Sequence, residues 1–424
     1  MSLANKQMTN IIRLPQLAWY ETKELQLPCP TGWQVEVCNM SGYNRPAMKP
    51  DEIRAAISNT IGTPPIRELA RGKSEVVIIF DDMTRVTRVA DIVPFVLEEL
   101  AEAGIPDNRI QFIAALGCHG AMNRLDFVKK LGESTLARFP VYNHNPFDNC
   151  VYVGTTSYGT RIFINAEVMK CDLKIVIGSI TPHVHAGFGG GGKIIGIGVA
   201  SFETIEALHR LEVKARQEHQ DKPVTGMGIF DNNPMRFNIE EAATLAGLDV
   251  KIDCLYNMWG ETVAIFAGAP IPAYAAGIQE AKAHYLTPRA VDKDIVIANT
   301  FAKANEVTIG LITASPSVTD RGGDVVLIGN APEGQVTHYL MGNFGKTIGG
   351  RLKLLQISPP PNVNHLILYT EYPDLAGRGY FEESDRFLFM SNWDDVLQVL
   401  QKSNRVNPKV AVYPSADSQY FAPF

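Results

Sequence analysis

Three polar side chains lie around a glycine-rich segment near the middle of the chain. His183 precedes the glycines at positions 187 and 189–192, Lys193 follows them directly, and His209 comes shortly afterwards. Imidazoles carry protons or bind metals near neutral pH, and an amine can form a covalent bond to a ligand. Glycines this dense weaken regular structure but allow backbone N–H groups to surround an anion. We therefore expect a phosphate-binding loop beside a site for proton transfer, covalent attachment or metal binding.

The segment from Gly187 to Lys193 also fits the spacing of a nucleotide-binding P-loop. Ile194 stands where that motif has a magnesium-binding Ser or Thr, and residues 179–186 separate the segment from the strand before it. A non-catalytic protein that carries a phosphate, nucleotide or cofactor on this loop, using Lys193, is the alternative to an enzyme. For His209 alone, a hydrogen-bonded structural histidine is the plain alternative to a metal ligand.

The elements that must position these groups are strands that end at polar residues. Residues 75–80 form an apolar run that predicts a buried strand, and Asp82, Thr84 and Arg85 follow it. Open α/β sheets place ligand contacts at the carboxyl ends of their strands. A guanidinium can hold a carboxylate through two hydrogen bonds, so Arg85 is a candidate for binding a substrate anion. A salt bridge to a neighbouring aspartate is the structural alternative.

The same arrangement of strand and polar loop recurs along the chain. A predicted strand over residues 109–115 leads to His119, and one over residues 173–177 leads to the glycine-rich segment. A helix that begins near Ser201 would carry His209. Taken alone, His119 could be a hydrogen-bonded loop residue. Together with His183 it forms a candidate pair for proton transfer.

These motifs resemble the nickel-pincer lactate racemase family of 2-hydroxyacid racemases and epimerases. The hallmark of that family is Pro-His, then Ala-Gly-Phe, a glycine run and a lysine, and residues 182–193 reproduce this order. The resemblance implies that Lys193 covalently holds pyridinium-3,5-bisthiocarboxylic acid mononucleotide, the nickel-pincer nucleotide. It also implies that His209 is the protein ligand to nickel. Imidazole and sulfur donors in a planar site suit that metal.

The resemblance implies roles for the polar strand ends as well. The family's Asp-x-Thr-Arg and Gly-x-His patterns are matched by residues 82–85 and 117–119. Two histidines suit the inversion of a carbon centre, because each face needs a group that gains or loses a proton near neutral pH. The implied residues are His119 and His183 for catalysis, Asp82, Thr84, Gly189, Gly190 and Gly191 for the cofactor, and Arg85 and Lys303 for the substrate.

The implied activity is inversion at the α-carbon of a 2-hydroxyacid. One histidine would take the hydroxyl proton while the α-hydrogen moves as a hydride to and from the cofactor. Three positions depart from the family's pattern, since Gly120 replaces Arg, Thr300 replaces Gln and Gly189 replaces Ser. A member of the fold with altered chemistry is therefore a further alternative, and Lys303 could instead be a surface lysine.

The composition bounds the kinds of partner. The chain has 39 basic and 45 acidic residues and a net charge of −6, so it has no basic excess for a nucleic acid or an anionic membrane. Six cysteines without a Cys-x-x-Cys pair suggest neither a zinc cluster nor a disulfide scaffold. We found no signal-peptide core or membrane-length apolar run, which predicts a cytoplasmic protein. The expected partners are a small 2-hydroxyacid and, by the resemblance, the enzymes that make the cofactor.

The length of 424 residues exceeds what one hydrophobic core usually supports, which favours two domains. Alternating strand and helix patterns predict an α/β protein, with a mainly parallel sheet flanked by helices in each domain. Residues 1–270 would form the N-terminal catalytic domain with extra antiparallel strands, residues 271–290 a connecting helix, and residues 291–424 the domain that closes the cleft. The last region is predicted to contain a helix near Gln335 and turns over residues 342–350.

Overall fold

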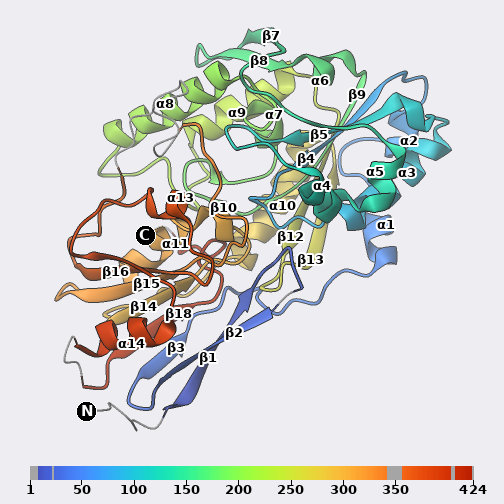
Figure 1. Ribbon diagram of the computed structural model, residues 1–424. Helices are drawn as coiled ribbons and strands as arrows, with labels where there is room; N and C mark the ends of the chain where they lie inside the picture. The colour runs from blue at the N-terminus through green and yellow to red at the C-terminus, as the bar shows by residue number, and fades with distance from the viewer. Residues whose placement is uncertain (1–7, 22, 341–355, 403–405, 423–424) are drawn as a thin grey trace.

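Two six-stranded sheets form the body of the protein (Figure 1). The computed structural model describes residues 8–21, 23–340, 356–402 and 406–422, so the turns predicted over residues 342–350 lie outside it. Most strand pairs in both sheets are parallel, and helices flank them. Small antiparallel sheets accompany the larger ones. The predicted α/β class is confirmed.

The first sheet is mainly parallel and buried on both faces. In β4, Ile78 and Phe80 join the core on one face, whereas Val77 and Ile79 join the core on the other. Successive side chains of a strand point to opposite faces, which explains why the sequence is a continuous apolar run. In spatial order the strands are β13 (Thr262–Gly268), which is antiparallel to its neighbour, β12 (Val250–Tyr256), β9 (Leu173–Ser179), β4 (Val76–Asp81), β5 (Ile110–Ala115) and β6 (Val141–Asn143).

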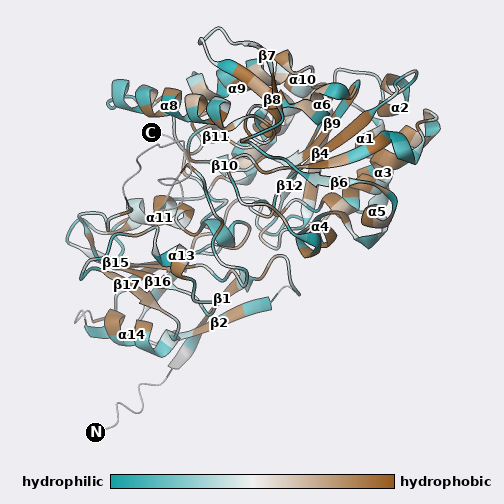
Figure 2. Ribbon diagram, turned by 45° about the horizontal axis from the view of Figure 1, so that its top comes forward, coloured by the Kyte–Doolittle hydropathy of each residue, from teal (hydrophilic) through white to brown (hydrophobic). Residues whose placement is uncertain are grey.

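Helices cover both faces of this sheet. Figure 2 shows β4 and β9 as largely hydrophobic, while much of the outer helix α8 is hydrophilic. Extra antiparallel strands, as predicted for residues 1–270, are present in the hairpin of β7 (Cys150–Thr155) and β8 (Arg161–Asn165). One face is covered by α1 (Pro50–Ser58), α2 (Ile66–Leu69), α3 (Val89–Glu102), α4 (Arg124–Leu131) and α5 (Glu133–Arg138), and the other by α6 (Ala166–Lys170), α7 (Lys193–Gly196), α8 (Phe202–Glu218) and α9 (Pro234–Leu245).

The second sheet is parallel throughout. Its edge strand β3 comes from the start of the chain, a region that the sequence placed with the first domain. Three of the four β3 residues are exposed, so the segment has no apolar pattern that would indicate which sheet it joins. The spatial order is β17 (Phe387–Met390), β16 (Val363–Tyr369), β15 (Gly323–Ile328), β14 (Ile295–Asn299), β18 (Lys409–Tyr413) and β3 (Gln34–Val37).

An antiparallel hairpin from the N-terminal region covers one face of the second sheet. Its strands are β1 (Met8–Gln16) and β2 (Lys23–Pro30), and Figure 1 shows them beside the second sheet. Ile12 packs in the same core as Trp393, the first residue of α14 (Trp393–Lys402). The indole Nε1–H of Trp393 also donates a hydrogen bond to the carbonyl of Pro28 at 2.8 Å.

Two predictions for the second half need correction or refinement. The helix predicted near Gln335 is wrong, because residues 329–340 form turns and irregular backbone. The Gln335 side chain instead bonds the backbone of residues 304–307. It accepts a hydrogen bond from the Val307 N–H at 2.9 Å and donates one to the Ala304 carbonyl at 2.8 Å. The helix that the alternating strand and helix pattern predicts after β14 begins as a short 3₁₀ turn, Ala304–Glu306, and continues as α11 (Ile309–Ala314).

A further hydrophobic core cluster lies where the two sheets meet. The connecting helix predicted within residues 271–290 is present as α10 (Pro270–His284), and its Tyr274 and Ile278 pack in this cluster. Phe301, which follows β14, joins them from the second sheet. None of the helices in the described ranges has the length and apolar character that crossing a bilayer requires.

The packing of the N-terminal hairpin on the second sheet can be tested with two neighbouring isoleucines. Ile12 is 4% exposed, whereas Ile11 on the same strand is 49% exposed. Ile12→Ala should therefore lower the free energy of unfolding by about 2–4 kcal/mol, and Ile11→Ala by less than about 1 kcal/mol. Denaturant unfolding followed by tryptophan fluorescence measures both. Equal effects of the two substitutions would contradict this packing.

Candidate active site

A cavity of about 450 Å³ lies between the carboxyl ends of the strands of both sheets. It is lined by residues that follow β4, β5 and β9 in the first sheet and β14 in the second. Gly191 is a predicted site residue that is not part of the lining. The predicted residues that do line it are Asp82, Thr84, Arg85, His119, His183, Gly189, Gly190, Lys193, His209 and Lys303.

Asp82 and His119 form a hydrogen-bonded pair at one side of the cavity. The Asp82 Oδ2 atom lies 2.6 Å from His119 Nδ1, and Asp82 Oδ1 accepts from the Thr84 N–H at 2.9 Å. Burial alone would raise the pKa of Asp82, but His119, Arg85 and Thr84 outweigh it and hold this pKa well below its usual range. A carboxylate only accepts hydrogen bonds, so His119 donates from Nδ1 and keeps the lone pair of Nε2 for a ligand.

His183 has the opposite arrangement of its ring nitrogens. Its Nδ1 accepts from the backbone N–H groups of His185 and Ala186, both at 3.2 Å. The neutral ring therefore carries its proton on Nε2. Burial, reinforced by the positive charge of Lys193 nearby, lowers the pKa of His183 well below its ordinary value. The two histidines thus differ in their resting state, since one offers a lone pair and the other an N–H.

Lys193 stands at the start of α7 with its amine at the cavity. Burial, followed by repulsion from Arg85, lowers the pKa of Lys193 to about 7. Within the described ranges, its Nζ makes no hydrogen bond or ion pair. A neutral amine is the nucleophilic form of lysine, so this side chain is available for covalent attachment.

His209 is carried by α8, which is capped by Ser201 as the sequence predicted. Its Nδ1–H donates to the carbonyl of Ile205, one turn earlier, at 2.7 Å. Burial, followed by the neighbouring His185, lowers the pKa of His209 to about 3. The ring is therefore neutral and presents the lone pair of Nε2, which is the form that binds a metal.

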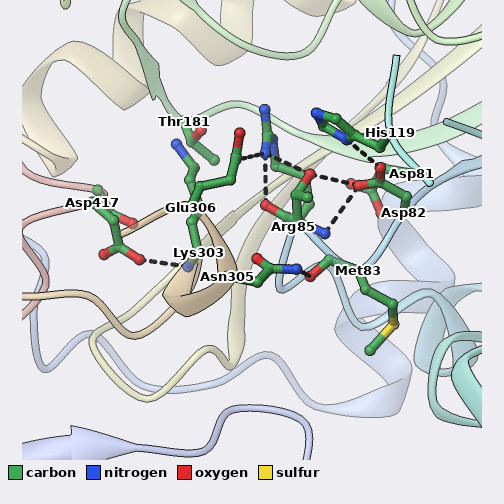
Figure 3. A network of polar contacts seen from close by, with 12 residues as sticks. Asp81, Asp82, Met83, Arg85, His119, Thr181, Lys303, Asn305, Glu306 and Asp417 are labelled. Atoms are coloured by element: carbon green, nitrogen blue, oxygen red, sulfur yellow. Dashed lines mark hydrogen bonds and ion pairs between the residues drawn. The ribbon is translucent and has the colours of Figure 1, made fainter. Parts of the chain in front are cut away.

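Arg85 is held between the two halves of the molecule (Figure 3). Its Nη1 donates to the carbonyl oxygen of Thr84 at 2.6 Å and to Glu306 Oε2, in the second half, at 2.8 Å. The salt-bridge partner is thus Glu306 rather than a neighbouring aspartate. Lys303 is 1% exposed and donates to the Pro182 carbonyl at 3.1 Å, so it is not a surface lysine. Burial, with repulsion from Arg85, lowers the pKa of Lys303 to about 7.

The glycine-rich loop does not present a ring of free N–H groups as we expected. The Gly191 N–H donates to Asp253 Oδ2 at 3.0 Å, and the Gly192 N–H donates to the Glu240 carboxylate at 3.1 Å. The Gly189 N–H donates to the Thr181 carbonyl at 2.7 Å. A phosphate at these groups would have to displace two carboxylates. The loop geometry therefore gives no support to the alternative of a nucleotide carrier.

Close packing explains the glycines instead. Gly190 and Gly191 have φ of +74° and +58°, a left-handed conformation that favours glycine. A Cβ atom at Gly190 would lie 2.7 Å from Asp253 Oδ1, and one at Gly191 would lie 2.8 Å from Glu240 Oε1. The loop carbonyls are held from the other side, because the Tyr274 hydroxyl donates to Gly189 at 2.9 Å. The loop is thus a rigid support directly before Lys193.

Comparisons with known proteins agree with this geometry. Residues 20–221 match the family model of the lactate racemase N-terminal domain. A lactate racemase of Thermoanaerobacterium thermosaccharolyticum is 30% identical over 251 residues, which cover 59% of this chain and 57% of that relative. One of Lactiplantibacillus plantarum is 28% identical over 304 residues, or 70% of each chain. The N-terminal half of the chain is thus similar to the N-terminal domain of lactate racemases.

A similarity in fold to one solved structure extends over nearly the whole chain. The structure of the lactate racemase apoprotein of T. thermosaccharolyticum has a TM-score of 0.72 at 22% identity, and the superposition covers 98% of this chain and 100% of that one. The aligned sequence spans a little over half, 57%, of the T. thermosaccharolyticum relative. The similarity in fold thus includes strands β14 to β18 of the second sheet, which lie outside the matched residues 20–221.

Gly120 and Thr300, which depart from the family's sequence pattern, lie in different surroundings: Gly120 contacts a segment of the second half, and Thr300 is buried away from the cavity. The Gly120 N–H donates to the Thr337 carbonyl at 3.0 Å, and a Cβ at Gly120 would lie 3.4 Å from the Cβ of Thr337. A longer side chain at this position would therefore press on the segment from the second half. Thr300 is fully buried and donates to the Ile328 carbonyl at 2.7 Å. It does not line the cavity.

Glu306, His338 and His185 are among the cavity residues that the sequence analysis did not assign to the site. Glu306 pairs with Arg85, as described above, and stands one turn after Lys303. The His338 ring lies 5.0 Å from that of His119, and the His185 ring lies 5.6 Å from that of His209. His185 could have been suspected from its place beside His183. No local pattern marks His338, because it lies in irregular backbone.

The lowered pKa of Lys193 has a measurable consequence. The amine should be mostly neutral above about pH 7, whereas an ordinary exposed lysine is neutral only above about pH 10.4. A limiting dose of an acylating reagent should therefore label Lys193 with a midpoint near pH 7, as read by peptide mass spectrometry. Lys214, 70% exposed on α8, is the comparison. Labelling of both lysines with the same high midpoint would contradict the effect of burial.

Proposed function

We propose that this protein is a racemase or epimerase that inverts the α-carbon of a 2-hydroxyacid. The observation that carries the proposal is the convergence of two histidines with complementary ring nitrogens, His119 and His183, on a cavity that also holds buried cations. Both residues follow strands of the first sheet, so their positions are set by the fold. The names of the relatives agree with this activity.

The residues present fit the nickel-pincer nucleotide. Lys193 has an amine without a protein partner in the described ranges, which suits a covalent tether. His209 presents Nε2 because its Nδ1–H is bound to Ile205, which suits one protein ligand to nickel. When bound, this cofactor supplies an acceptor for the α-hydrogen as a hydride. Gly189 and Gly190 would form the wall behind it.

His119 and His183 divide the handling of the hydroxyl proton. His119 Nε2 accepts the proton of a substrate hydroxyl, and Asp82 stabilises the positive charge that develops on the ring. His183, with its proton on Nε2, donates a hydrogen bond to a substrate oxygen. Inversion in both directions requires His183 to accept a proton as well. To accept a proton on Nε2, the neutral ring must carry its proton on Nδ1 instead. Nδ1 is then a hydrogen-bond donor, so the N–H groups of His185 and Ala186, which donate to it in this structure, must turn away.

Arg85 and Lys303 bind the substrate carboxylate. Thr84 and Glu306 occupy only Nη1 of Arg85, and among the described residues no partner takes Nε or Nη2. That edge of the guanidinium can hold a carboxylate through two hydrogen bonds. Lys303 would add a positive charge, because the negative charge of a bound carboxylate raises the pKa of a nearby lysine.

Intact mass and nickel content test the tether. The wild-type protein, expressed together with the enzymes that make the cofactor, should carry one adduct and bound nickel. Lys193→Ala should carry neither. Lys303→Ala is the matched control, since Lys303 lines the same cavity and also has a pKa of about 7, and it should keep the adduct. An unmodified wild-type mass beside a loaded positive control would remove the basis of the proposal.

The histidine pair is tested on the loaded protein. His119→Ala and His183→Ala should each lower the rate of 2-hydroxyacid inversion by about 10²–10⁴-fold, because each removes a group that handles the hydroxyl proton. Nickel should stay bound in both variants. His219→Ala, at an exposed position near the end of α8, should keep its rate. Full activity in either of the first two variants would exclude that histidine from catalysis.

A further inference from the structure

Glu306 places a carboxylate inside the part of the cavity that should bind the substrate. Its side chain is 14% exposed and bonds Arg85 through Oε2 at 2.8 Å. Its other oxygen, Oε1, accepts no hydrogen bond from the described residues, and the residue lines the cavity. Burial would raise the pKa of Glu306, but Arg85, His119 and Lys303 outweigh it and hold this pKa below its usual value. The group is therefore an ionised acceptor with one free oxygen.

The charges around Glu306 limit what the cavity can accept. Arg85 is paired with Glu306, and Asp82 is hydrogen-bonded to His119. Lys303 has no carboxylate within ion-pair distance among the described side chains, and its Nζ bonds a backbone carbonyl. This cluster can therefore compensate one substrate carboxylate. A second carboxylate on the substrate would meet Glu306 with no cation left to neutralise it.

Arg85 holds Glu306 beside the edge of the guanidinium at which the substrate carboxylate is proposed to bind. A carboxylate bound at the Nε and Nη2 edge of the guanidinium shares that group with Glu306, which is bound at Nη1. A substituent of the α-carbon that extends toward Glu306 would then meet Oε1. An ionised oxygen in a buried place needs a hydrogen-bond donor, and leaving it against a methyl group costs free energy.

We propose that Glu306 selects 2-hydroxyacids that carry a further hydroxyl beside the reacting carbon, and that it disfavours both plain alkyl and dicarboxylic 2-hydroxyacids. This inference rests on the proposed racemase or epimerase function. The extra hydroxyl of such a polyhydroxy acid donates to Oε1. In lactate a methyl group stands in that place, and in malate a carboxylate.

Glycerate and lactate form a matched pair, because they differ only by the hydroxyl on the third carbon. The loaded wild-type protein should invert glycerate with a kcat/KM about 10- to 100-fold above that for lactate, as expected for one hydrogen bond to a charged group. Malate should be the poorest of the three. The ratio between two substrates in one sample does not depend on how much of the protein is folded or loaded.

Variants of Glu306 assign the preference to this residue. Glu306→Ala should bring the ratio of glycerate to lactate to within about 3-fold. Glu306→Gln keeps an acceptor oxygen without the charge, so it should keep part of the preference for glycerate and improve malate about 10-fold. Glu333→Gln is the control, since Glu333 also pairs with a cation of the first half, Lys129, but does not line the cavity. It should keep the wild-type ratio.

The possible results separate the substrate preference, the role of Glu306 in it and the proposed function. If wild type inverts lactate as well as glycerate, the selection by a second hydroxyl is wrong while the proposed function stands. If the preference survives in Glu306→Ala, Glu306 is not its cause. If none of the three acids is inverted although the adduct and nickel are present, this inference is wrong. The proposed function fails only if larger 2-hydroxyacids are not inverted either.

Discussion

Burial of positive groups between facing strand ends is the constraint on which the site depends. An amine or imidazole that loses its water loses its charge more readily, so Lys193 and His209 are neutral in conditions where exposed lysines are charged. A neutral amine can attack a carbon centre, and a neutral imidazole can bind a metal. The same fold feature, two sheets whose carboxyl ends meet, thus creates the cavity and sets the chemical form of its residues.

Two carboxylates, each paired with a buried cation, hold the backbone of the glycine-rich loop before Lys193. Asp253 accepts a hydrogen bond from the Gly191 N–H and pairs with Lys251 at 2.7 Å, and the side chains of Asp253 and Lys251 are fully buried. Glu240 holds the loop one residue later and pairs with Arg236 at 2.9 Å. Removing one partner from a buried pair leaves an uncompensated charge, at a cost of about 3–5 kcal/mol. The loop before Lys193 is therefore unlike a flexible glycine linker, although its composition is similar.

The sequence was informative where local patterns decide the structure. The apolar runs that became β4, β5 and β9 each lead to a residue of the cavity, because carboxyl ends of parallel strands share one edge. It was uninformative where contacts join distant segments, as for Glu306 and His338. The glycine-rich loop was misread for a physical reason. A chain that can surround a phosphate can also pass closely over buried carboxylates, and composition does not distinguish the two.

The position of β3 has a consequence for how the chain acquires its structure. Residues 34–37 pair with β18, whose strand begins at Lys409, so almost the entire polypeptide separates the two partners. Contacts between such distant segments form late, since closing a long loop precedes any gain from pairing. During synthesis, the whole first sheet can assemble before the partner of β3 exists. A segment made early thus cannot join the second sheet until β18 has been made.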